Sequence, residues 1–435
     1  MKKLPEFRRP LSSQQKELMD KMITGISSPD VKTVSFRAEN VLMMLPFAEE
    51  SSFFALMEED FRGMCKKSRS FADMRTDAAD AAEKKLSLNS PVKLSDIYNI
   101  LMKQSGISEE QRDSLMEREC QLYLQYVIPR ECGTVLFKKA ADGNKKIIVT
   151  STGVYPRETV KKALEKCGFG SCNIFILHSE LNVPAAAETA FLDIVMKKAK
   201  GKPSSVLHIG SDVKTDVEAP ILKGARALLL QPAVPLMIKS GRFRGYVQAQ
   251  HLYEYDSDSF FAFRGLMGLY CCYGFGWPQK KTTHSDFCSD PHMLGFLVLG
   301  GMSMAKDVSL TPAQENILKA LEVCPEAAEG FEDFKEMRNA VFGNILASHG
   351  TKGCELPLIF LESFAYQGDR EMLSQYLSEA DMGKWAKNPK EPELAPVYAH
   401  KAKKNAVARL ADKLFPPGTR VRTIADDILS KSKKI

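Results

Sequence analysis

The sequence has no long apolar run, no CxxC pair and no internal repeat. Its longest apolar stretches, such as residues 293–304, are interrupted by glycine and are shorter than the roughly 20 residues that a membrane span needs. The ten cysteines include no CxxC pair, so we expect free thiols in a reducing compartment. The first residues carry no apolar run of signal-peptide length. Together these absences exclude a membrane-spanning, disulfide-stabilised or solenoid protein and predict a cytoplasmic one.

The sequence also has little net charge. A formal charge of +6 is spread over 60 basic and 54 acidic residues, so nucleic-acid binding is not expected. Much of the excess lies in residues 400–435, which carry ten Lys or Arg and three Asp. A solvated helix is the default interpretation of this basic tail, and peripheral contact with an anionic membrane surface or a partner is the alternative. A content of 44% hydrophobic and 26% charged residues is typical of a globular chain.

Short apolar strands alternate with helices over much of the chain. A strand is expected at residues 31–36, followed by helical periodicity over residues 50–135. Further strands are expected at residues 146–151, 173–178, 205–209 and 225–230, with helices at 156–167, 185–200 and 212–224 between them. This alternation predicts an α/β fold with a doubly wound parallel sheet. Residues 258–385 are expected to be mostly helical, except for a loop at the Gly- and aromatic-rich residues 269–277.

We therefore predict four parts in the chain. Residues 1–46 and 136–232 form the α/β core, and residues 47–135 form a helical cap inserted into it. Residues 233–387 form a helical C-terminal domain, and residues 388–435 form the basic tail.

Polar residues follow four of the expected strands. They are Arg37 and Glu39, Ser151 and Thr152, His178 and Ser179, and residues 210–216. The carboxyl ends of parallel strands meet at one edge of a sheet, where ligands usually bind. Hydroxyls that face helix N-termini at such an edge can bind an anion. Capping of the following helices is the simpler interpretation of the same residues.

Four segments at these strand ends also occur in the order of a known set of motifs. They read SFRAENVLMMLP at residues 35–46, STGVYP at 151–156, HSELNVPAAA at 178–187 and HIGSDVKTD at 208–216. With them, the sequence resembles the haloacid dehalogenase-like superfamily, and within it a bacterial subgroup encoded with surface-polysaccharide genes. Residues 75–79, 117–119, 285–295 and 415–420 also resemble segments of that subgroup. The resemblance covers essentially the whole chain and implies a Rossmann-like core with an inserted cap.

The same resemblance implies that the catalytic motifs are degenerate. Family members attack a phosphoryl group with a carboxylate, and they hold Mg²⁺ with that carboxylate and an acid of the fourth motif. Here the nucleophile position is Arg37, the lysine of the third motif falls on or near Ala185, and the first acid of the fourth motif is Ser211. An arginine cannot act as the nucleophile and would repel a metal. We therefore expect no catalytic residue and no cofactor.

The surviving members of the motifs leave three interpretations open. Arg37 pairs with Asp216 or Glu39, which is the interpretation we favour because buried acids need a counter-charge. Alternatively, Arg37, Ser151 and Thr152 bind an anion such as a phosphorylated sugar. As a third interpretation, the chain is an active phosphohydrolase with a displaced acidic nucleophile and Mg²⁺. Its candidate metal ligands are Asp212, one position off the expected acid, and Asp216.

A dense group of potential ligands occurs near residue 290. It contains His284, Asp286, Cys288, Asp290 and His292. Their spacing fits no common zinc site, so no metal is expected there. By resemblance, the chain is expected to be an accessory or binding protein in capsular or other surface-polysaccharide biosynthesis. Its expected partners are a glycosyltransferase or another assembly protein.

Overall fold

A computed structural model gives the fold of this chain. It describes residues 6–64, 69–86, 90–181, 188–239, 258–279, 290–304, 310 and 312–343. The chain divides into two units, residues 1–389 and 390–435. All of the described residues belong to the first unit. The basic tail therefore lies outside them, and its predicted roles remain predictions.

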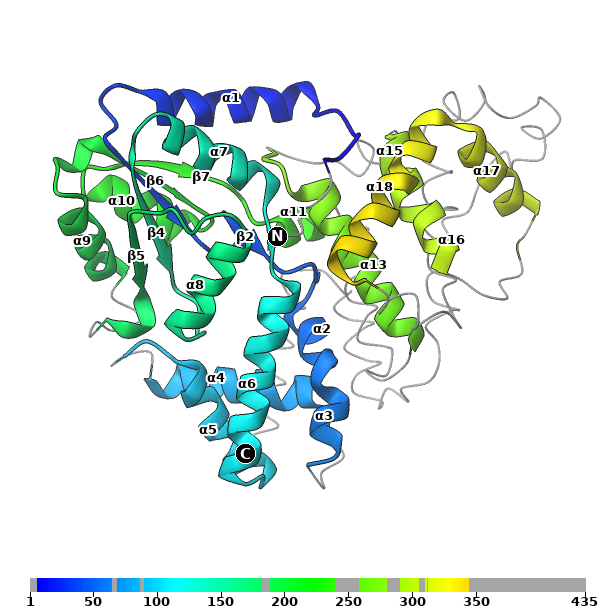
Figure 1. Ribbon diagram of the computed structural model, residues 1–435, viewed down its shortest axis with the longest axis horizontal. Helices are drawn as coiled ribbons and strands as arrows, with labels where there is room; N and C mark the ends of the chain where they lie inside the picture. Colours follow the sequence, from blue (N-terminus) through cyan, green and yellow to red (C-terminus); the bar gives the residue numbers. More distant parts are fainter. Residues whose placement is uncertain are drawn as a thin grey trace, which may run out of the picture. The chain divides into compact units, whose positions relative to one another are not determined.

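A five-stranded parallel sheet forms the core of the first unit (Figure 1). Its order is β5-β4-β1-β6-β7, so the first strand of the chain is the central one. All five residues of β1 are buried, as expected for a strand covered on both faces. The strands are β1 (Thr33–Arg37), β4 (Lys146–Ser151), β5 (Ile174–Leu177), β6 (Val206–Gly210) and β7 (Arg226–Leu229). The predicted doubly wound α/β sheet is confirmed.

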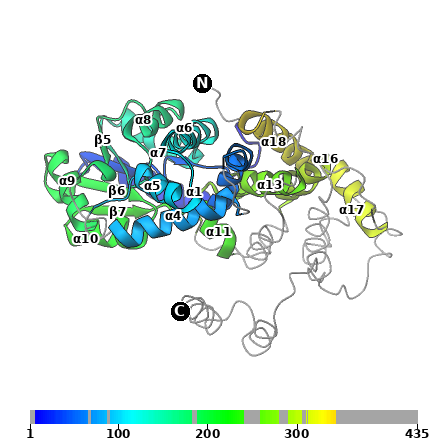
Figure 2. The same cartoon turned by 90° about the horizontal axis from the view of Figure 1, so that it is seen from below.

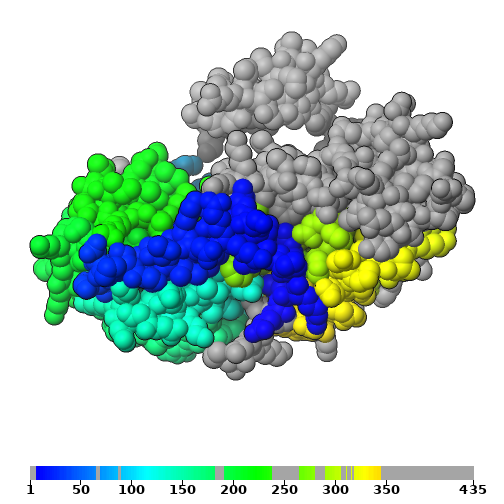
Figure 3. Space-filling model, turned by 90° about the horizontal axis from the view of Figure 1, so that it is seen from above, coloured from blue at the N-terminus to red at the C-terminus, as the bar shows by residue number. Residues whose placement is uncertain are grey.

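Helices cover both faces of this sheet (Figures 1 and 2). On one face, Phe137 of α7 (Glu131–Asp142) contacts Phe36 of β1, with ring centroids 5.8 Å apart. The helix α1 (Ser13–Ser27) packs on α7 and lies along the surface, in blue in Figure 3. On the opposite face, α9 (Glu188–Ala199) packs over Ile148 and Val206. The connections also include α8 (Arg157–Lys166), a π-helical turn (Lys214–Glu218) and α10 (Ala219–Leu222).

A helical cap is inserted between β1 and β4. The chain leaves the core through β2 (Met43–Met44) and returns through β3 (Ile128–Pro129), and these two short strands pair antiparallel. Figures 1 and 2 show α4 and α5 of the cap side by side. The cap helices are α2 (Glu50–Phe54), a 3₁₀ turn (Ala55–Met57), α3 (Glu58–Arg62), α4 (Phe71–Leu86), α5 (Leu94–Ser105) and α6 (Glu109–Tyr126). The helical insertion predicted from periodicity is thus present.

A buried polar network ties the cap to the core. Arg75 of α4 donates two hydrogen bonds of 2.8 Å to the Glu119 carboxylate of α6. The same carboxylate accepts hydrogen bonds from Tyr98 (2.8 Å) and from Tyr155 (3.2 Å), which follows β4 in the core. The Tyr155 ring also stacks on Tyr123 of α6, with centroids 4.2 Å apart. Because the charges of Arg75 and Glu119 are paired and hydrogen-bonded, burial of both is tolerated.

Further helices follow the sheet. They are α11 (Ala233–Lys239), α13 (Asp258–Phe275), α15 (Pro291–Leu294), a π-helical turn (Gly295–Leu299), α16 (Gly300–Met304), α17 (Pro312–Val323) and α18 (Pro325–Val341). The loop predicted at residues 269–277 is wrong, because α13 continues to Phe275. None of the described helices combines the length and the apolar character that crossing a membrane requires.

The helix α13 contains glycine for reasons of packing. A Cβ added to Gly268 would overlap the backbone carbonyl of Pro46, so a close helix-to-loop approach requires glycine there. The fully buried Arg130 fixes the end of the same helix. Its guanidinium donates hydrogen bonds to the carbonyls of Asn40, Gln231 (2.9 Å) and Gly276 (2.7 Å). One side chain thereby joins the loop after β1, the segment after β7 and the end of α13.

The contact between α7 and the loop after β1 gives a first prediction. A Cβ on Gly133 would overlap the carbonyl oxygen of Val41, so Gly133→Ala is expected to destabilise the fold by about 3 kcal/mol. Gly63→Ala is the matched control, since that position has a right-handed φ of −69° and no atom within 4 Å of an added Cβ. Urea unfolding of both variants measures the difference, and equal stabilities would contradict the described packing.

Candidate functional site

The candidate site lies at the carboxyl end of the central strand. Arg37 is the last residue of β1 and is paired in register with Thr150 of β4. The chain then turns sharply, and Asn40 adopts a φ of 62°, a left-handed conformation that asparagine tolerates better than most residues. The side chain of Arg37 is only 7% exposed. Its charge is therefore buried at the carboxyl edge of the sheet.

The Arg37 guanidinium is bound by Asp216, which lies in the turn after β6. Nε donates to Oδ2 of Asp216 at 3.3 Å, and one terminal nitrogen donates to Oδ1. The other terminal nitrogen donates to the Thr152 hydroxyl at 2.8 Å, and Thr215 accepts a longer bond of 3.4 Å. The fork of the guanidinium thus meets the carboxylate with two nitrogens, an arrangement typical of strong Arg–carboxylate pairs.

Backbone groups and a histidine complete the surroundings of Asp216. Its Oδ2 accepts hydrogen bonds from the N–H groups of Ser211 (2.8 Å) and Asp212 (3.1 Å). Its Oδ1 lies 3.3 Å from Nε2 of His208, whose Nδ1 lies 3.1 Å from the Ser35 hydroxyl. An imidazole that carries a proton on Nε2 donates to the Asp216 carboxylate. Each Asp216 oxygen is therefore fully engaged by protein donors.

These contacts change the acidity of the Asp216 carboxyl. Burial acts to raise its pKa, but the hydrogen bond from His208 and the charge of Arg37 outweigh burial and hold the pKa well below the usual range. Gly210 allows this arrangement, since a Cβ there would overlap the Asp216 side chain. The pKa of His178, which directly follows β5, is lowered as well. Burial, with the nearby Arg37 charge, lowers the pKa of its imidazole, which keeps it neutral.

Glu39 forms a second, separate contact at the same edge. Its carboxylate accepts a hydrogen bond from the Ser151 hydroxyl and a longer one, 3.4 Å, from the Thr152 N–H. Gly153 lies close to it, since an added Cβ would stand 3.0 Å from Oε1 of Glu39. Of the two partners predicted for Arg37, the structure pairs Asp216 with it, while Glu39 pairs with the β4 end.

The predicted site residues are brought together only in part. Arg37, Thr152 and Asp216 form one cluster, and Ser211 contributes its backbone N–H to it. The Asp212 carboxylate caps its own turn by accepting from the N–H groups of Lys214 and Thr215, both at 2.9 Å. Ala185 lies outside the described residues.

The residues near 290 do not form a cluster in the described part of the chain. Asp290 pairs with Arg9 at 2.7 Å, and His292 faces Glu329 at 3.5 Å. His284, Asp286 and Cys288 lie outside the described residues. Within the described ranges, no group of three or more His, Cys, Asp or Glu is placed to hold a metal.

His208 and Thr215 contact the charged pair but were not singled out from the sequence. The contact of His208 with the pair could have been predicted from the alternation of side chains along a strand. His208 is in register with Ser35, so both point to the same face of the sheet as Arg37. Thr215 stands one residue before Asp216, and nothing in its spacing predicts a contact with the guanidinium.

The residues at this edge do not fit a magnesium ion. Mg²⁺ needs several free oxygen ligands in near-octahedral geometry. Here both oxygens of the buried carboxylate are taken up by Arg37, His208 and backbone N–H groups. The guanidinium, moreover, supplies the positive charge beside Asp216. What the arrangement can do chemically is to neutralise a buried carboxylate without a metal.

Breaking this buried pair is expected to be costly. Arg37→Met leaves the Asp216 charge without its counter-ion, and we expect a loss of about 3 to 5 kcal/mol in the free energy of unfolding. Arg69→Met is the matched control, since Arg69 pairs with Asp77 at 2.7 Å with both side chains about half exposed. That substitution is expected to cost about 0.5 kcal/mol or less. Similar losses for both variants, measured by urea unfolding, would show that the Arg37 pair is not buried.

The depressed pKa of Asp216 predicts a loss of stability in acid. The unfolded chain takes up a proton at this residue near pH 3.9, whereas the folded chain keeps the carboxylate ionised to lower pH. The contribution of Asp216 is thus fully present above about pH 5 and is lost progressively as the pH falls below about 4. We expect the stability difference between wild type and Asp216→Asn to shrink between pH 5 and pH 3. A difference that stays constant over that interval in urea titrations would contradict the assignment.

Comparisons with known proteins give structural neighbours only. No protein-family model and no curated protein matches the sequence. One similar solved structure is a haloacid dehalogenase-like family hydrolase from Xanthomonas campestris, with 13% identity and a TM-score of 0.35, covering 47% of this chain and 83% of the other. Another is the L-2-haloacid dehalogenase of Xanthobacter autotrophicus, with 16% identity and a TM-score of 0.35, covering 50% and 88%. A third is a phosphoglycolate phosphatase predicted for Haemophilus somnus 129PT, with 14% identity and a TM-score of 0.33, covering 47% and 86%. These three solved structures are a haloacid dehalogenase, a haloacid dehalogenase-like hydrolase and a predicted phosphatase, at similarities that carry no argument about the activity of this chain.

Proposed function

We propose that this chain is a hydrolase-like protein that does not hydrolyse phosphate esters and serves as an accessory or binding protein in surface-polysaccharide assembly. The observation that supports loss of hydrolysis is the pair between Arg37 and Asp216. By the family resemblance, a cation occupies the nucleophile position, and it is held by Asp216, an acid of the fourth motif. Phosphoryl transfer needs a nucleophile and charge neutralisation at the phosphoryl group. This site offers neither.

The geometry gives little support to a displaced nucleophile. Glu39 is hydrogen-bonded to Ser151 and Thr152, and Asp212 is engaged by its own turn, including the Thr215 hydroxyl at 3.2 Å. A nucleophilic carboxylate needs a free oxygen directed at the phosphorus and a nearby cation to neutralise the phosphoryl charge. The nearest cation, Arg37, already donates four hydrogen bonds to Asp216, Thr152 and Thr215. The same engagement disfavours Arg37 as an anion receptor.

The cellular role rests on the sequence resemblance. The motifs at residues 35–46, 151–156 and 208–216 resemble those of a subgroup encoded with surface-polysaccharide genes. A protein that keeps such a scaffold without its nucleophile is useful for what it binds. A glycosyltransferase or another assembly protein is therefore the proposed partner, and the basic tail from residue 388 is its proposed contact or a contact with an anionic membrane.

Turnover assays test the loss of hydrolysis. Purified protein with millimolar Mg²⁺ is expected to release no phosphate from 4-nitrophenyl phosphate or from hexose phosphates above the enzyme-free blank. A phosphatase of the same superfamily, assayed in parallel, shows that the conditions allow turnover. Magnesium-dependent turnover that disappears in both Asp212→Ala and Asp216→Ala would overturn the proposal and establish the displaced-nucleophile enzyme.

A further inference from the structure

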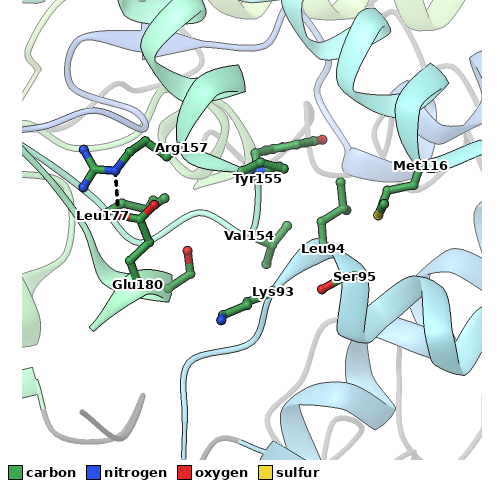
Figure 4. Close-up of a pocket in the computed structure, with 11 residues that line it drawn as sticks. Lys93, Leu94, Ser95, Met116, Val154, Tyr155, Arg157, Leu177 and Glu180 are labelled. Carbon is green, nitrogen blue, oxygen red and sulfur yellow. Dashed lines mark hydrogen bonds and ion pairs between the residues drawn. The ribbon is translucent and has the colours of Figure 1, made fainter. Parts of the chain in front are cut away.

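A pocket of about 290 Å³ lies between the cap and the core. Figure 4 shows residues at the start of α5 facing residues that follow β4 and β5. Its lining includes Lys93 and Leu94 from the cap, and Val154 and Ser179 from the core. Because the pocket lies at the ends of β4 and β5, it belongs to the same edge of the sheet as Arg37. The opposite edge, where the strands begin, carries a separate feature.

The amino-terminal edge of the sheet is basic on the side of α9 and α10. Both helices end there, lie side by side (Figures 1 and 2), and lead into β6 and β7. The acids Asp30 and Asp193 are each paired, with Arg226 at 3.2 Å and with Lys223 at 2.5 Å. Further exposed cations have no ion pair among the described residues, and they are Lys32, Lys197, Lys198, Lys200 and Lys202.

Capping of free carbonyl groups does not account for these exposed lysines. Cations near the C-terminus of a helix often serve that purpose, but here two other lysines supply it. The Lys146 ammonium donates to the carbonyl of Lys198 at 2.7 Å. The Lys145 ammonium donates to the carbonyls of Ser28 at 3.0 Å and Val31 at 2.7 Å. The charges of the exposed lysines are therefore available to a partner.

An apolar protrusion lies beside the lysines of residues 197–202. Leu222 is 83% exposed, the highest value among the large apolar residues that the structure describes, and Ile221 is 55% exposed. The two segments meet because Ala199 and Ala225 belong to one apolar cluster. In addition, a Cβ added to Gly224 would stand 3.8 Å from the Pro203 side chain. Unpaired cations and exposed apolar side chains thus share one surface.

This combination fits an anionic lipid surface better than other partners. Protein interfaces are depleted in lysine and enriched in arginine and aromatic residues, and single-stranded nucleic acids are bound largely by aromatic stacking. None of the exposed large apolar residues in the described part of the chain is aromatic. A membrane with anionic headgroups attracts lysines through its charge and takes up leucine and isoleucine side chains at the edge of its acyl region.

We propose that this amino-terminal edge docks on an anionic phospholipid membrane. The lysines of residues 197–202 lie against the headgroups, and Leu222 and Ile221 enter the boundary between headgroups and acyl chains. Docking at the beginnings of the strands leaves the cap and Arg37, at the ends of the strands, facing water. The folded core makes this contact, so it is separate from any contact of the basic tail and does not depend on loss of hydrolysis.

Co-sedimentation of the full chain with vesicles tests the proposal. We expect binding to phosphatidylcholine vesicles that contain about one third phosphatidylglycerol, little binding to pure phosphatidylcholine, and release in about 0.5 M NaCl. The triple variant Lys197→Gln, Lys200→Gln and Lys202→Gln is expected to weaken binding about tenfold or more. Leu222→Ser is expected to weaken it about fivefold, because less apolar surface leaves water. All four side chains are exposed, so both variants are expected to fold.

Two matched controls separate this edge from the rest of the molecule. The triple variant Lys84→Gln, Lys85→Gln and Lys103→Gln removes the same charge from exposed positions of the cap. Val323→Ser removes an apolar side chain that is 62% exposed on α17. Neither is expected to change vesicle binding, and both leave the basic tail intact.

Four results would overturn the proposal. They are absence of binding to the anionic vesicles, binding that the edge triple variant leaves unchanged, equal losses in the two triple variants, and binding that Leu222→Ser leaves unchanged. The second result would assign the contact to another part of the chain, such as the tail. The last, together with equally strong binding of single-stranded DNA, would identify a general polyanion surface in place of a lipid one.

Discussion

A buried guanidinium held by one carboxylate determines the carboxyl edge of the sheet. Neither charge could remain in the interior alone, because an unpaired ion there costs several kcal/mol. Arg37 and Asp216 therefore require one another, and the chain around them is arranged accordingly. Gly210 leaves space for the carboxylate, and two backbone N–H groups after β6 complete its hydrogen bonds. A metal-binding hydrolase site has the same need to neutralise a buried acid, but here the neutralising cation is part of the chain.

Much of the fold could be predicted from the sequence, since strands of buried β-branched residues alternate with helices in a pattern that few architectures share. The partner of Arg37 could not be predicted from the sequence. Asp216 and Glu39 were both candidates. Which of them pairs with Arg37 depends on the register of the strands, because that register places the Ser151 hydroxyl next to Glu39 and the Arg37 guanidinium next to Asp216. The helix over residues 269–275 was also missed. Glycine and aromatic residues there suggest a loop by propensity, but the helix continues through them, and the neighbouring Gly268 is required by the close approach of α13 to Pro46.

The pocket between the cap and the core could not be predicted from the sequence either, because its lining residues are far apart in the chain. Lys93 and Ser179 are far apart in the chain, and neither belongs to a motif with recognisable spacing. They come together because the cap is fixed on the core by Tyr155, whose hydroxyl reaches Glu119 and whose ring stacks on Tyr123. The Leu94 N–H also donates to the Val154 carbonyl at 2.9 Å. These contacts hold the start of α5 and the side of α6 against the segment that follows β4.

The hydrogen bonds of Arg130 have a consequence for the order in which the chain folds. Its guanidinium needs the carbonyls of Gln231 and Gly276, which are 101 and 146 residues later in the sequence. During synthesis the cap and most of the sheet leave the ribosome first. The Arg130 guanidinium therefore lacks two of its hydrogen-bond partners until the end of α13 has been made. The nascent core therefore reaches its final state late, and shortened chains that end before residue 276 would expose an unsatisfied cation to chaperones and proteases.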